Sequence, residues 1–144
     1  MNKKVADVLS RKGISLISVT PDTTVYDALK IMADRNIGAV IVLSGDEYKG
    51  IVTERHYARK VVLEHKNSST TAVSEIMGTD FPIVTQQDKI DHCMQLMSER
   101  NIRYLPVFEN DKVLGILSIN DLVKETILSQ EETINHLTDY LHAG

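Results

Sequence analysis

The sequence predicts a mixed α/β fold made of two copies of one β-α-β-β-α unit. Two motifs recur at one offset of 65 residues: Arg35-Asn36-Ile37 returns as Arg100-Asn101-Ile102, and Gly50-Ile51 returns as Gly115-Ile116. The register needs no gap between about residue 19 and residue 62. Within each copy, apolar residues follow first a helical and then a strand-like spacing. A repeat of this kind indicates two copies of one supersecondary unit.

Each copy is predicted to open with a short strand and a helix. Ile17-Ser18-Val19 is β-prone, and residues 20–23 end this strand and offer Thr or Asp to cap the helix that follows. An apolar face at i, i+3, i+4 and i+7 predicts the helix. In the first copy this face is Val25, Ala28, Leu29 and Met32, and in the second it is Ile90, Cys93, Met94 and Met97. The single cysteine is thus expected in the core.

Two strands and a second helix complete each copy. The first copy has apolar runs at residues 37–43 and 49–52 around a turn at 44–46, and the second has runs at 104–108 and 113–117 around a turn at 109–111. The second helices are predicted to begin near Glu54 and near Asn120. Pro106 has no N–H to donate, so its strand should be an edge strand or should be paired on one side only.

Further segments flank the two units. A short helix is expected before each one, at Val5–Leu9 and at Val73–Met77, and the C-terminal stretch from Leu122 to Leu141 should be helical. Its apolar stripe consists of Val123, Ile127, Ile134, Leu137 and Leu141. Such a stripe must pack on something, and a second subunit is one candidate. The expected organisation is a first repeat at 1–64, a polar linker at 65–72, a second repeat at 73–128 and a helical tail at 129–144.

Composition excludes several classes of protein. The chain has 144 residues, of which 42% are hydrophobic and 25% are charged, as in one ordinary soluble domain. The longest apolar run, residues 39–43, is far shorter than the roughly 20 residues of a membrane span, and no signal segment opens the chain. We therefore expect a cytoplasmic protein without a membrane partner. A net charge of −4 without a basic run argues against nucleic acid as the main partner.

Four segments carry a resemblance to a known family. They are residues 50–61 in the first copy and residues 73–77, 100–107 and 115–122 in the second. On these segments and the repeat spacing, residues 1–128 resemble a tandem pair of cystathionine-β-synthase (CBS) domains, a Bateman module of the stand-alone type. The resemblance implies two repeats packed sheet to sheet with pseudo-twofold symmetry. It also implies two clefts for adenosine-containing ligands such as AMP, ADP, ATP, NAD(H) or S-adenosylmethionine.

The resemblance assigns the main cleft to the segment that ends in Ser118, Asn120 and Asp121. A hydroxyl and a helix N-terminus there suit a phosphate, and the carboxylate suits both ribose hydroxyls. The implied binding residues are Ile17, Ser18, Val19, Thr20, Gly38, Ala39, Ser118, Asn120 and Asp121. From the residues alone, Ser118 and Asp121 are explained as the N-cap and a first-turn acid of a helix.

The second cleft departs from the family pattern at His56, where the resemblance implies a ribose-binding Asp. The implied residues are Thr53, Arg55, His56, Pro82, Ile83, Arg103 and Tyr104. A neutral imidazole cannot bridge a diol as a carboxylate does, whereas a cationic His56 beside Arg55 and Arg103 would suit a phosphate. Loss of the ligand, a change of ligand and retained binding all remain open for this cleft.

The sequence therefore predicts a non-enzymatic module that senses an adenine nucleotide (AMP, ATP or NAD(H)) and modulates an unidentified partner protein, as a homodimer. The alternative is a ligand-independent dimerisation or adaptor module with vestigial clefts. An enzyme is not expected, because we find no Ser-His-Asp order, no paired carboxylates at related positions and no metal-ligand spacing.

Overall fold

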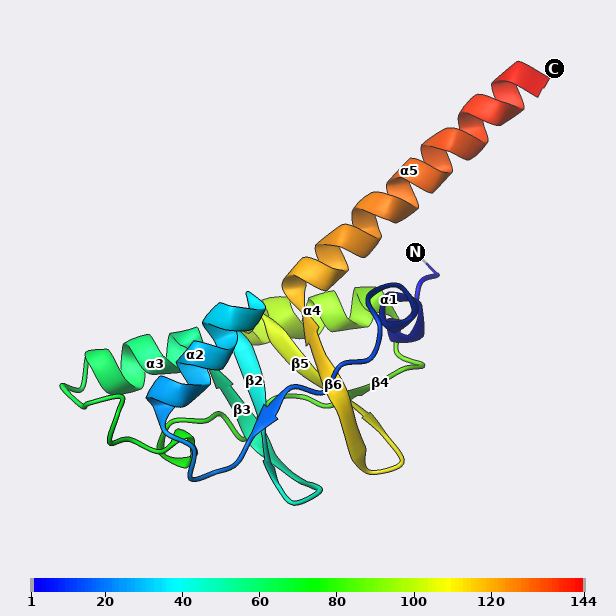
Figure 1. Cartoon of the computed structure of the whole chain (residues 1–144). Helices are drawn as coiled ribbons and strands as arrows, with labels where there is room; N and C mark the ends of the chain where they lie inside the picture. The colour runs from blue at the N-terminus through cyan, green and yellow to red at the C-terminus, as the bar shows by residue number, and fades with distance from the viewer. Residues whose placement is uncertain (1, 144) are drawn as a thin grey trace.

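The computed structural model describes residues 2–143 and confirms the mixed α/β fold, with two three-stranded sheets (Figure 1). The first copy contains α1 (Val5–Lys12), β1 (Ser18–Val19), α2 (Val25–Arg35), β2 (Ala39–Ser44), β3 (Glu47–Thr53), α3 (Glu54–Tyr57) and η1 (Ala58–Val62), a π-helical turn. The second copy contains η2 (Val73–Glu75), a 3₁₀ turn, β4 (Val84–Thr85), α4 (Ile90–Arg100), β5 (Tyr104–Glu109), β6 (Lys112–Ser118) and α5 (Ile119–Ala143).

The repeat in the sequence is a repeat in the backbone. Helices α2 and α4 end at Asn36 and Asn101, both of which adopt the left-handed conformation with φ of 53°. Asparagine is one of the few residues that tolerate this conformation as a helix C-cap. This requirement explains why Arg-Asn-Ile recurs at the same place in each copy.

The recurring Gly-Ile pair has the same place in both sheets, and in the first copy it marks a close approach of two backbones. Gly50 lies opposite Val42 in the β2–β3 ladder, as Gly115 lies opposite Val107 in the β5–β6 ladder. A Cβ atom at Gly50 would overlap the carbonyl oxygen of Gly78. That segment is held by two backbone hydrogen bonds between Ile51 and Gly78, of 3.0 and 2.9 Å. Glycine is required at residue 50 because any side chain would push this segment away.

The two copies exchange their leading helices. Helix α1 does not pack on the strands that follow it, because Val5, Val8 and Leu9 lie in the core of the second copy with α4, β5 and β6. Its start is fixed there by hydrogen bonds from the N–H groups of Val5 and Ala6 to residues 88 and 86. Conversely, Val73 of η2 and the adjacent Ile76 are buried in the core of the first copy. Neither core is complete without a segment from the other copy.

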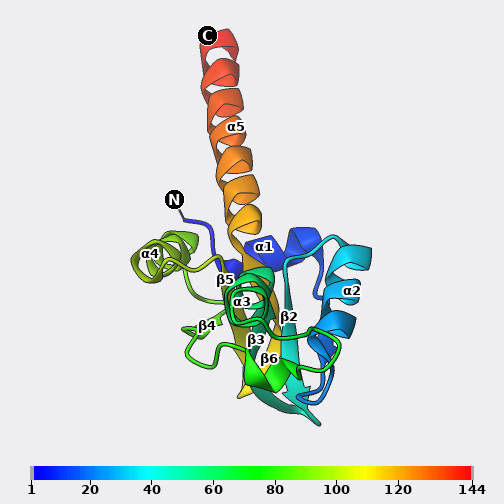
Figure 2. The ribbon, with the colours of Figure 1, turned by 90° about the vertical axis from the view of Figure 1, so that its left-hand side faces the viewer.

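A third apolar cluster joins the two sheets. Its members are Ala39, Ile41, Ile51 and Val113, with Leu43, Tyr48, Phe81, Tyr104, Phe108 and Ile116 packed against them. The rings of Tyr48 and Phe108 meet edge to face, with 5.1 Å between their centroids. Figure 2 shows the resulting layers, in which α2 and α4 lie on opposite outer sides and the strands lie between them. This arrangement leaves the ends of β3 and β6 near the boundary between the sheets.

Three local expectations need correction or refinement. Helix α2 is capped by Thr24, whose Oγ1 accepts the Asp27 N–H at 3.1 Å, rather than by a residue of the 20–23 turn. The helix expected at residues 73–77 is only a 3₁₀ turn, because Gly78 forms an antiparallel β-bridge with Ile51 of β3 and the chain is extended there. Strand β5 is the middle strand of its sheet, so it is not an edge strand. Pro106 nevertheless pairs on one side only, with Ile116, because the ladder to β4 begins at Val107.

Two other features agree with the expectations from the sequence. Cys93 is fully buried in the second core, where burial raises the pKa of its thiol to about 11. Helix α5 continues through the predicted tail to Ala143, and Gly144 lies outside the described residues. Among residues 2–143, no helix combines the length and the apolar character that crossing a membrane requires.

An ion pair between the buried Glu125 and the partly exposed Arg11 joins α5 to the exchanged helix α1. The Glu125 carboxylate is only 2% exposed, and Arg11 Nε lies 2.9 Å from its Oε2. The same guanidinium reaches Glu132, about two turns further along α5, with 3.2 Å between Nη2 and Oε1. A buried carboxylate needs such a partner because it has lost its hydration.

We predict that Arg11→Ala lowers the free energy of unfolding by about 2–4 kcal/mol, because it leaves the Glu125 carboxylate buried without its cation. Urea denaturation of the full chain measures this loss. Adding Glu125→Leu to the Arg11→Ala variant should recover most of the stability, since the pair is then replaced by an apolar contact. If both variants are equally unstable, the loss does not come from the stranded charge.

Candidate functional site

Two cavities lie at the boundary between the sheets, with volumes of about 370 and 360 Å³. Both fall within the size range of small-molecule sites. We call the one at the start of α5 the first cleft and the one at the start of α3 the second cleft. They share Gly38 and Tyr104. A Cβ atom at Gly38 would overlap the Tyr104 hydroxyl and lie 2.9 Å from Glu54 Oε1, so glycine here lets the tyrosine stand between the clefts.

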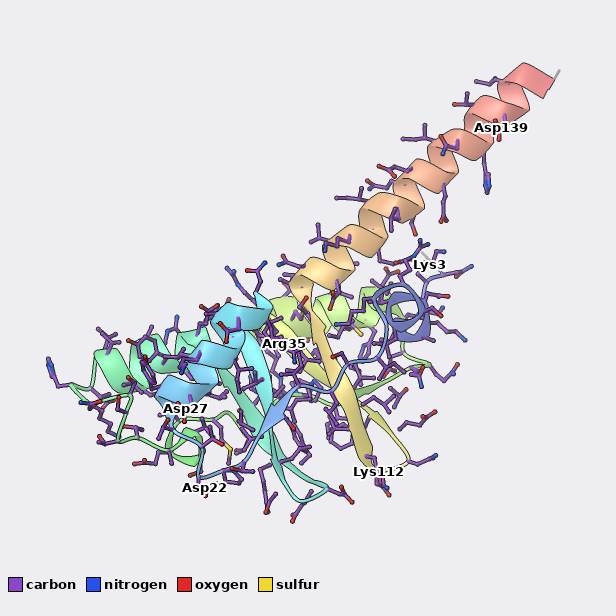
Figure 3. The ribbon with its side chains drawn as sticks, viewed as in Figure 1. Lys3, Asp22, Asp27, Arg35, Lys112 and Asp139 are labelled. Atoms are coloured by element: carbon purple, nitrogen blue, oxygen red, sulfur yellow. The ribbon has the colours of Figure 1, made fainter. Side chains whose placement is uncertain are left out.

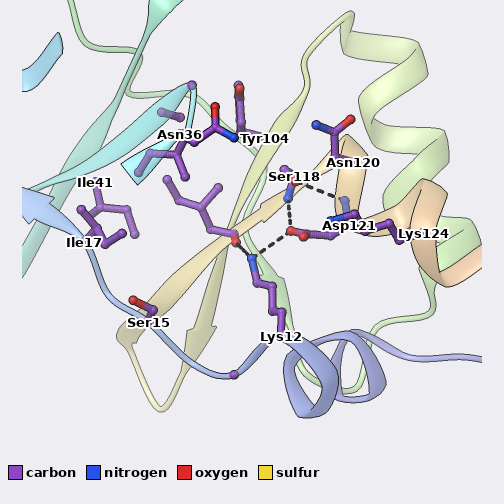
Figure 4. Close-up of a pocket in the computed structure, with 15 residues that line it drawn as sticks. Lys12, Ser15, Ile17, Asn36, Ile41, Tyr104, Ser118, Asn120, Asp121 and Lys124 are labelled. Carbon is purple, nitrogen blue, oxygen red and sulfur yellow. Dashed lines mark hydrogen bonds and ion pairs between the residues drawn. The ribbon is translucent and has the colours of Figure 1, made fainter. Parts of the chain in front are cut away.

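The first cleft is built around the N-terminus of α5 (Figure 4). The Ser118 N–H donates to Asp121 Oδ2 at 2.8 Å, and the Asp121 N–H donates to Ser118 Oγ at 3.2 Å. These reciprocal bonds form a capping box that sets both side chains at the end of β6. Ser118 and Asp121 therefore do cap the N-terminus of α5, as the residues alone predicted. Their polar atoms also line the cavity, so capping and ligand binding do not exclude each other.

Helix α1 supplies a cation to the first cleft. Lys12 Nζ lies 2.8 Å from Asp121 Oδ2 and donates to the Ile116 carbonyl oxygen, also at 2.8 Å (Figure 4). Lys124, one turn into α5, lines the same cavity. With two ammonium groups and one carboxylate, the charges of these three side chains sum to a positive value, which favours an anionic ligand.

The lining of the first cleft agrees only in part with the residues that the sequence assigned to it. Ile17, Gly38, Ala39, Ser118, Asn120 and Asp121 line the cavity, together with Lys12, Gly13, Ser15, Asn36, Ile37, Ile41, Tyr104, Ile116 and Lys124. The lining does not include Ser18, Val19 or Thr20. Beyond Ile17 the chain enters β1 and runs along β2, and Val19 is buried in the first core. The recurring Asn-Ile pair was a signal for Asn36 and Ile37, whereas nothing in the sequence pointed to Lys12.

The second cleft repeats this construction at the N-terminus of α3. Thr53 and His56 form the equivalent capping box, in which the Thr53 N–H donates to His56 Nδ1 and the His56 N–H donates to Thr53 Oγ1, both at 3.1 Å. Arg55 Nη1 donates to the Asn101 carbonyl oxygen at 2.7 Å. The cavity is lined by Gly38, Thr53, Glu54, Arg55, His56, Phe81, Ile102, Arg103 and Tyr104.

The expected closing residues of the second cleft, Pro82 and Ile83, are not part of this lining. Ile83 is 54% exposed. Phe81 lines the cavity instead, and its ring packs edge to face on His56, with centroids 6.1 Å apart. Arg103 and Tyr104 occupy the positions that correspond to Gly38 and Ala39 in the other copy, so the two clefts have walls of different size and charge.

His56 is neutral near pH 7 in the folded protein, which disfavours the alternative of a cationic His56 that holds a phosphate. Burial, with the neighbouring positive charges of Lys60, Arg55 and Arg59, lowers the pKa of His56 to about 4, against a smaller opposing effect of Asp80. Its Nδ1 accepts the Thr53 N–H and therefore carries no proton. Any cationic contact to a phosphate in this cleft must come from an arginine.

A family model for the CBS domain matches residues 5–63 and 73–127 of the chain. The chain is 35% identical over 149 residues to CBS domain-containing protein CBSX3, a mitochondrial protein of Arabidopsis thaliana, which covers 97% of this chain and 72% of that relative. A solved structure of a CBS-domain protein from Burkholderia ambifaria superposes with a TM-score of 0.85 at 45% identity, over 89% of this chain and 96% of that one.

The CBS domain pair of protein MJ0100 has been solved in complex with 5′-methylthioadenosine and S-adenosyl-L-methionine. It superposes with a TM-score of 0.72 over 86% of this chain and 99% of that one. At 23% identity, this likeness shows a common fold.

We predict that the stability of the protein falls on acidification partly through His56. An unfolded chain binds this proton near pH 6.5, but the folded chain binds it only near pH 4, so the free energy of unfolding decreases as the pH falls through that window. The contribution is about 1–3 kcal/mol after solvent screening is allowed for. His56→Asn keeps an acceptor for the Thr53 N–H but does not titrate.

Urea denaturation at pH 7 and at pH 4.5 should therefore give a smaller difference for His56→Asn than for the original chain. His65→Asn is the matched control, because residue 65 is exposed and has a φ of 58°, which asparagine also tolerates. Equal pH dependence in all three proteins would show that His56 titrates normally.

Proposed function

Because the chain belongs to the CBS-domain family, we propose that it is a non-enzymatic regulatory module that binds an adenosine-containing ligand in the first cleft. The family resemblance inferred from the repeated motifs is confirmed by the matched domains. The observation that carries the proposal is the position of Asp121 and Ser118 at the N-terminus of α5, inside a cavity whose opposite wall is Gly38, Ala39 and Ile41. A polar end and an apolar wall suit a nucleoside.

The placement of the ligand follows from the chemistry of these walls. Asp121 Oδ2 is engaged by Ser118 and Lys12, so Oδ1 is the oxygen that we expect to accept a ribose hydroxyl. The adenine would lie against Ile17, Ala39 and Ile41. A phosphate would then lie near Asn120, where the positive end of the helix dipole favours it. The adenosine compounds held by the MJ0100 domain pair support a ligand of this class.

The two lysines favour a phosphorylated ligand. Lys12 can leave the Ile116 carbonyl oxygen and Asp121 for a phosphate oxygen, since it is attached to a flexible chain and 36% of its side chain is exposed. Lys124 adds a second positive charge at the same rim. We therefore expect AMP, ATP or NAD(H) rather than S-adenosylmethionine, whose sulfonium is cationic.

Regulation would operate through α1. Its last two residues join the cleft to the long helix, because Lys12 contacts Asp121 while Arg11 holds Glu125. A ligand that draws Lys12 away from Asp121 changes how α1 is held against α5. Such a change becomes a signal only if the ligand binds the two arrangements with different affinities. The receiver of the signal would be a partner protein, and the module itself would act as a homodimer.

An adaptor function without a ligand is the second candidate. The Lys12–Asp121 ion pair favours it, since the carboxylate that would bind ribose already has a cationic partner at 2.8 Å. In that case the cleft is a structural joint between the two copies. Titration with nucleotides separates the two candidates directly.

We predict that Asp121→Asn weakens binding of AMP and of adenosine alike by about 1–3 kcal/mol, because an amide offers one acceptor where the carboxylate offers two and carries no charge. The Asn side chain still accepts the Ser118 N–H, so the helix cap is retained. Isothermal titration calorimetry measures both affinities. Asp111→Asn, in the β5–β6 turn, is the matched control and should bind as the original chain does. Unchanged affinity in Asp121→Asn would remove the ribose role of Asp121.

For the second cleft we predict that His56→Asp creates or strengthens a second binding event. An aspartate there can accept the Thr53 N–H as Asp121 accepts that of Ser118, and its free oxygen can accept a ribose hydroxyl. Calorimetry should show a stoichiometry that rises toward two, or a tighter second phase. If stoichiometry and affinities match those of the original chain, residue 56 does not control this cleft.

A further inference from the structure

Helix α5 carries an apolar face that no other part of the described chain covers. The side chains of Val123, Ile127, Ile134, Leu137 and Leu141 are between 49% and 77% exposed. Every residue from Gln130 to Asp139 is exposed, and the helix extends away from both sheets, so that Asp139 lies far from the rest of the molecule (Figure 3). We call these five apolar residues the tail stripe.

The tail stripe has the spacing of a coiled coil. Ile127, Ile134 and Leu141 are seven residues apart and take position a of a heptad, while Val123, Gln130 and Leu137 take position d. The pattern therefore runs without a break from Val123 to Leu141, a length of about 28 Å at 1.5 Å per residue. Only Gln130 is polar among these six positions.

The rest of the protein lies on the other side of α5. Leu122 and Glu125, which pack on α1 and the second core, occupy positions c and f, roughly opposite the a and d positions. The stripe thus faces away from the body along its whole length. A helical extension with no partner is marginally stable in water, so an apolar seam of this kind is expected to be buried in the assembled protein.

We infer that the tail stripe forms a parallel two-stranded coiled coil with the tail stripe of a second copy of this chain. The β-branched Ile127 and Ile134 at position a, with Leu137 at position d, favour two parallel strands. In a parallel pair the two Gln130 side chains meet and can hydrogen-bond to each other. In an antiparallel pair with full overlap, each Gln130 faces Ile134 instead, which buries an amide against an apolar group.

The charges flanking the seam agree with the parallel arrangement. Position e holds Lys124, Glu131 and Thr138, and position g holds Thr126, Thr133 and Tyr140. In a parallel pair, Glu131 lies beside Thr126 of the other chain. The antiparallel pair would place Glu131 beside Glu131, and like charges across a seam oppose pairing.

Sedimentation equilibrium of the full chain tests this interface. Ile134→Glu should raise the dimer dissociation constant at least about tenfold, because it brings two carboxylates into the apolar seam. Asn135→Glu, the matched control, adds the same charge one residue further on, at position b, and should change the constant by less than about twofold. A monomeric original chain, or equal constants for the two variants, would overturn the coiled coil.

The direction of the strands is tested by Leu137→Cys, since two d-position sulfurs approach each other only in a parallel pair. Mild oxidation should convert this variant to a covalent dimer, while the original chain, whose Cys93 is buried, should stay uncrosslinked. A covalent dimer from mixed Ile127→Cys and Leu137→Cys chains, but not from Leu137→Cys alone, would establish the antiparallel pair and refute the proposal.

The inference extends the homodimer proposed above but does not depend on nucleotide binding. AMP titration of the Ile134→Glu variant distinguishes the coiled coil from the nucleotide-binding proposal. Loss of the dimer with unchanged AMP affinity supports the coiled coil alone. A dimer that survives Ile134→Glu means that another surface joins the copies, so the homodimer would stand and the coiled coil would fail.

Discussion

The exchange of α1 and η2 between the two copies is the constraint on which the rest of the structure depends. Each core contains buried residues from the other copy, Val5 and Leu9 in one and Val73 and Ile76 in the other. Neither β-α-β-β-α unit can therefore complete its core alone. The exchange also holds the two sheets face to face, and the clefts exist only because of this apposition. A displacement of α1 or η2 would therefore alter the packing of the opposite copy's core and the cleft at its edge.

Pseudo-symmetry makes the two clefts comparable, and their side chains make them different. Both are built on a capping box at the start of a helix, with Ser118 and Asp121 in one and Thr53 and His56 in the other. The carboxylate has two acceptor atoms and a charge. The buried imidazole has one acceptor, which the Thr53 N–H uses, and a pKa lowered to about 4 that keeps it neutral. A duplicated backbone has thus acquired two sites with unequal chemistry.

Helix α1 is the physical link between the first cleft and the tail. Lys12 and Arg11 are adjacent in sequence but reach different parts of α5, Asp121 at its N-terminus and Glu125 a turn later. The tail stripe begins on the opposite side of the same helix. The ligand site, the exchanged helix and the surface that we assign to a second copy are therefore contiguous, which is the arrangement that coupling between them requires.

The secondary-structure elements and their apolar faces were largely predictable from the sequence, because periodic patterns report local structure. The helix and strand order, the buried Cys93 and the apolar stripe of the C-terminal helix follow from spacing at short range, and the repeat follows from matching motifs, whereas the cleft roles of Ser118 and Asp121 came from the family resemblance. What sequence could not supply were contacts between distant segments. The packing of α1 on the opposite copy brought Lys12 to Asp121, Phe81 lines the second cleft in place of Pro82 and Ile83, and burial decided the charge of His56. Amino-acid order determined the elements and their apolar faces. Tertiary structure alone decided which faces meet, because partner choice and desolvation depend on residues far away in the chain.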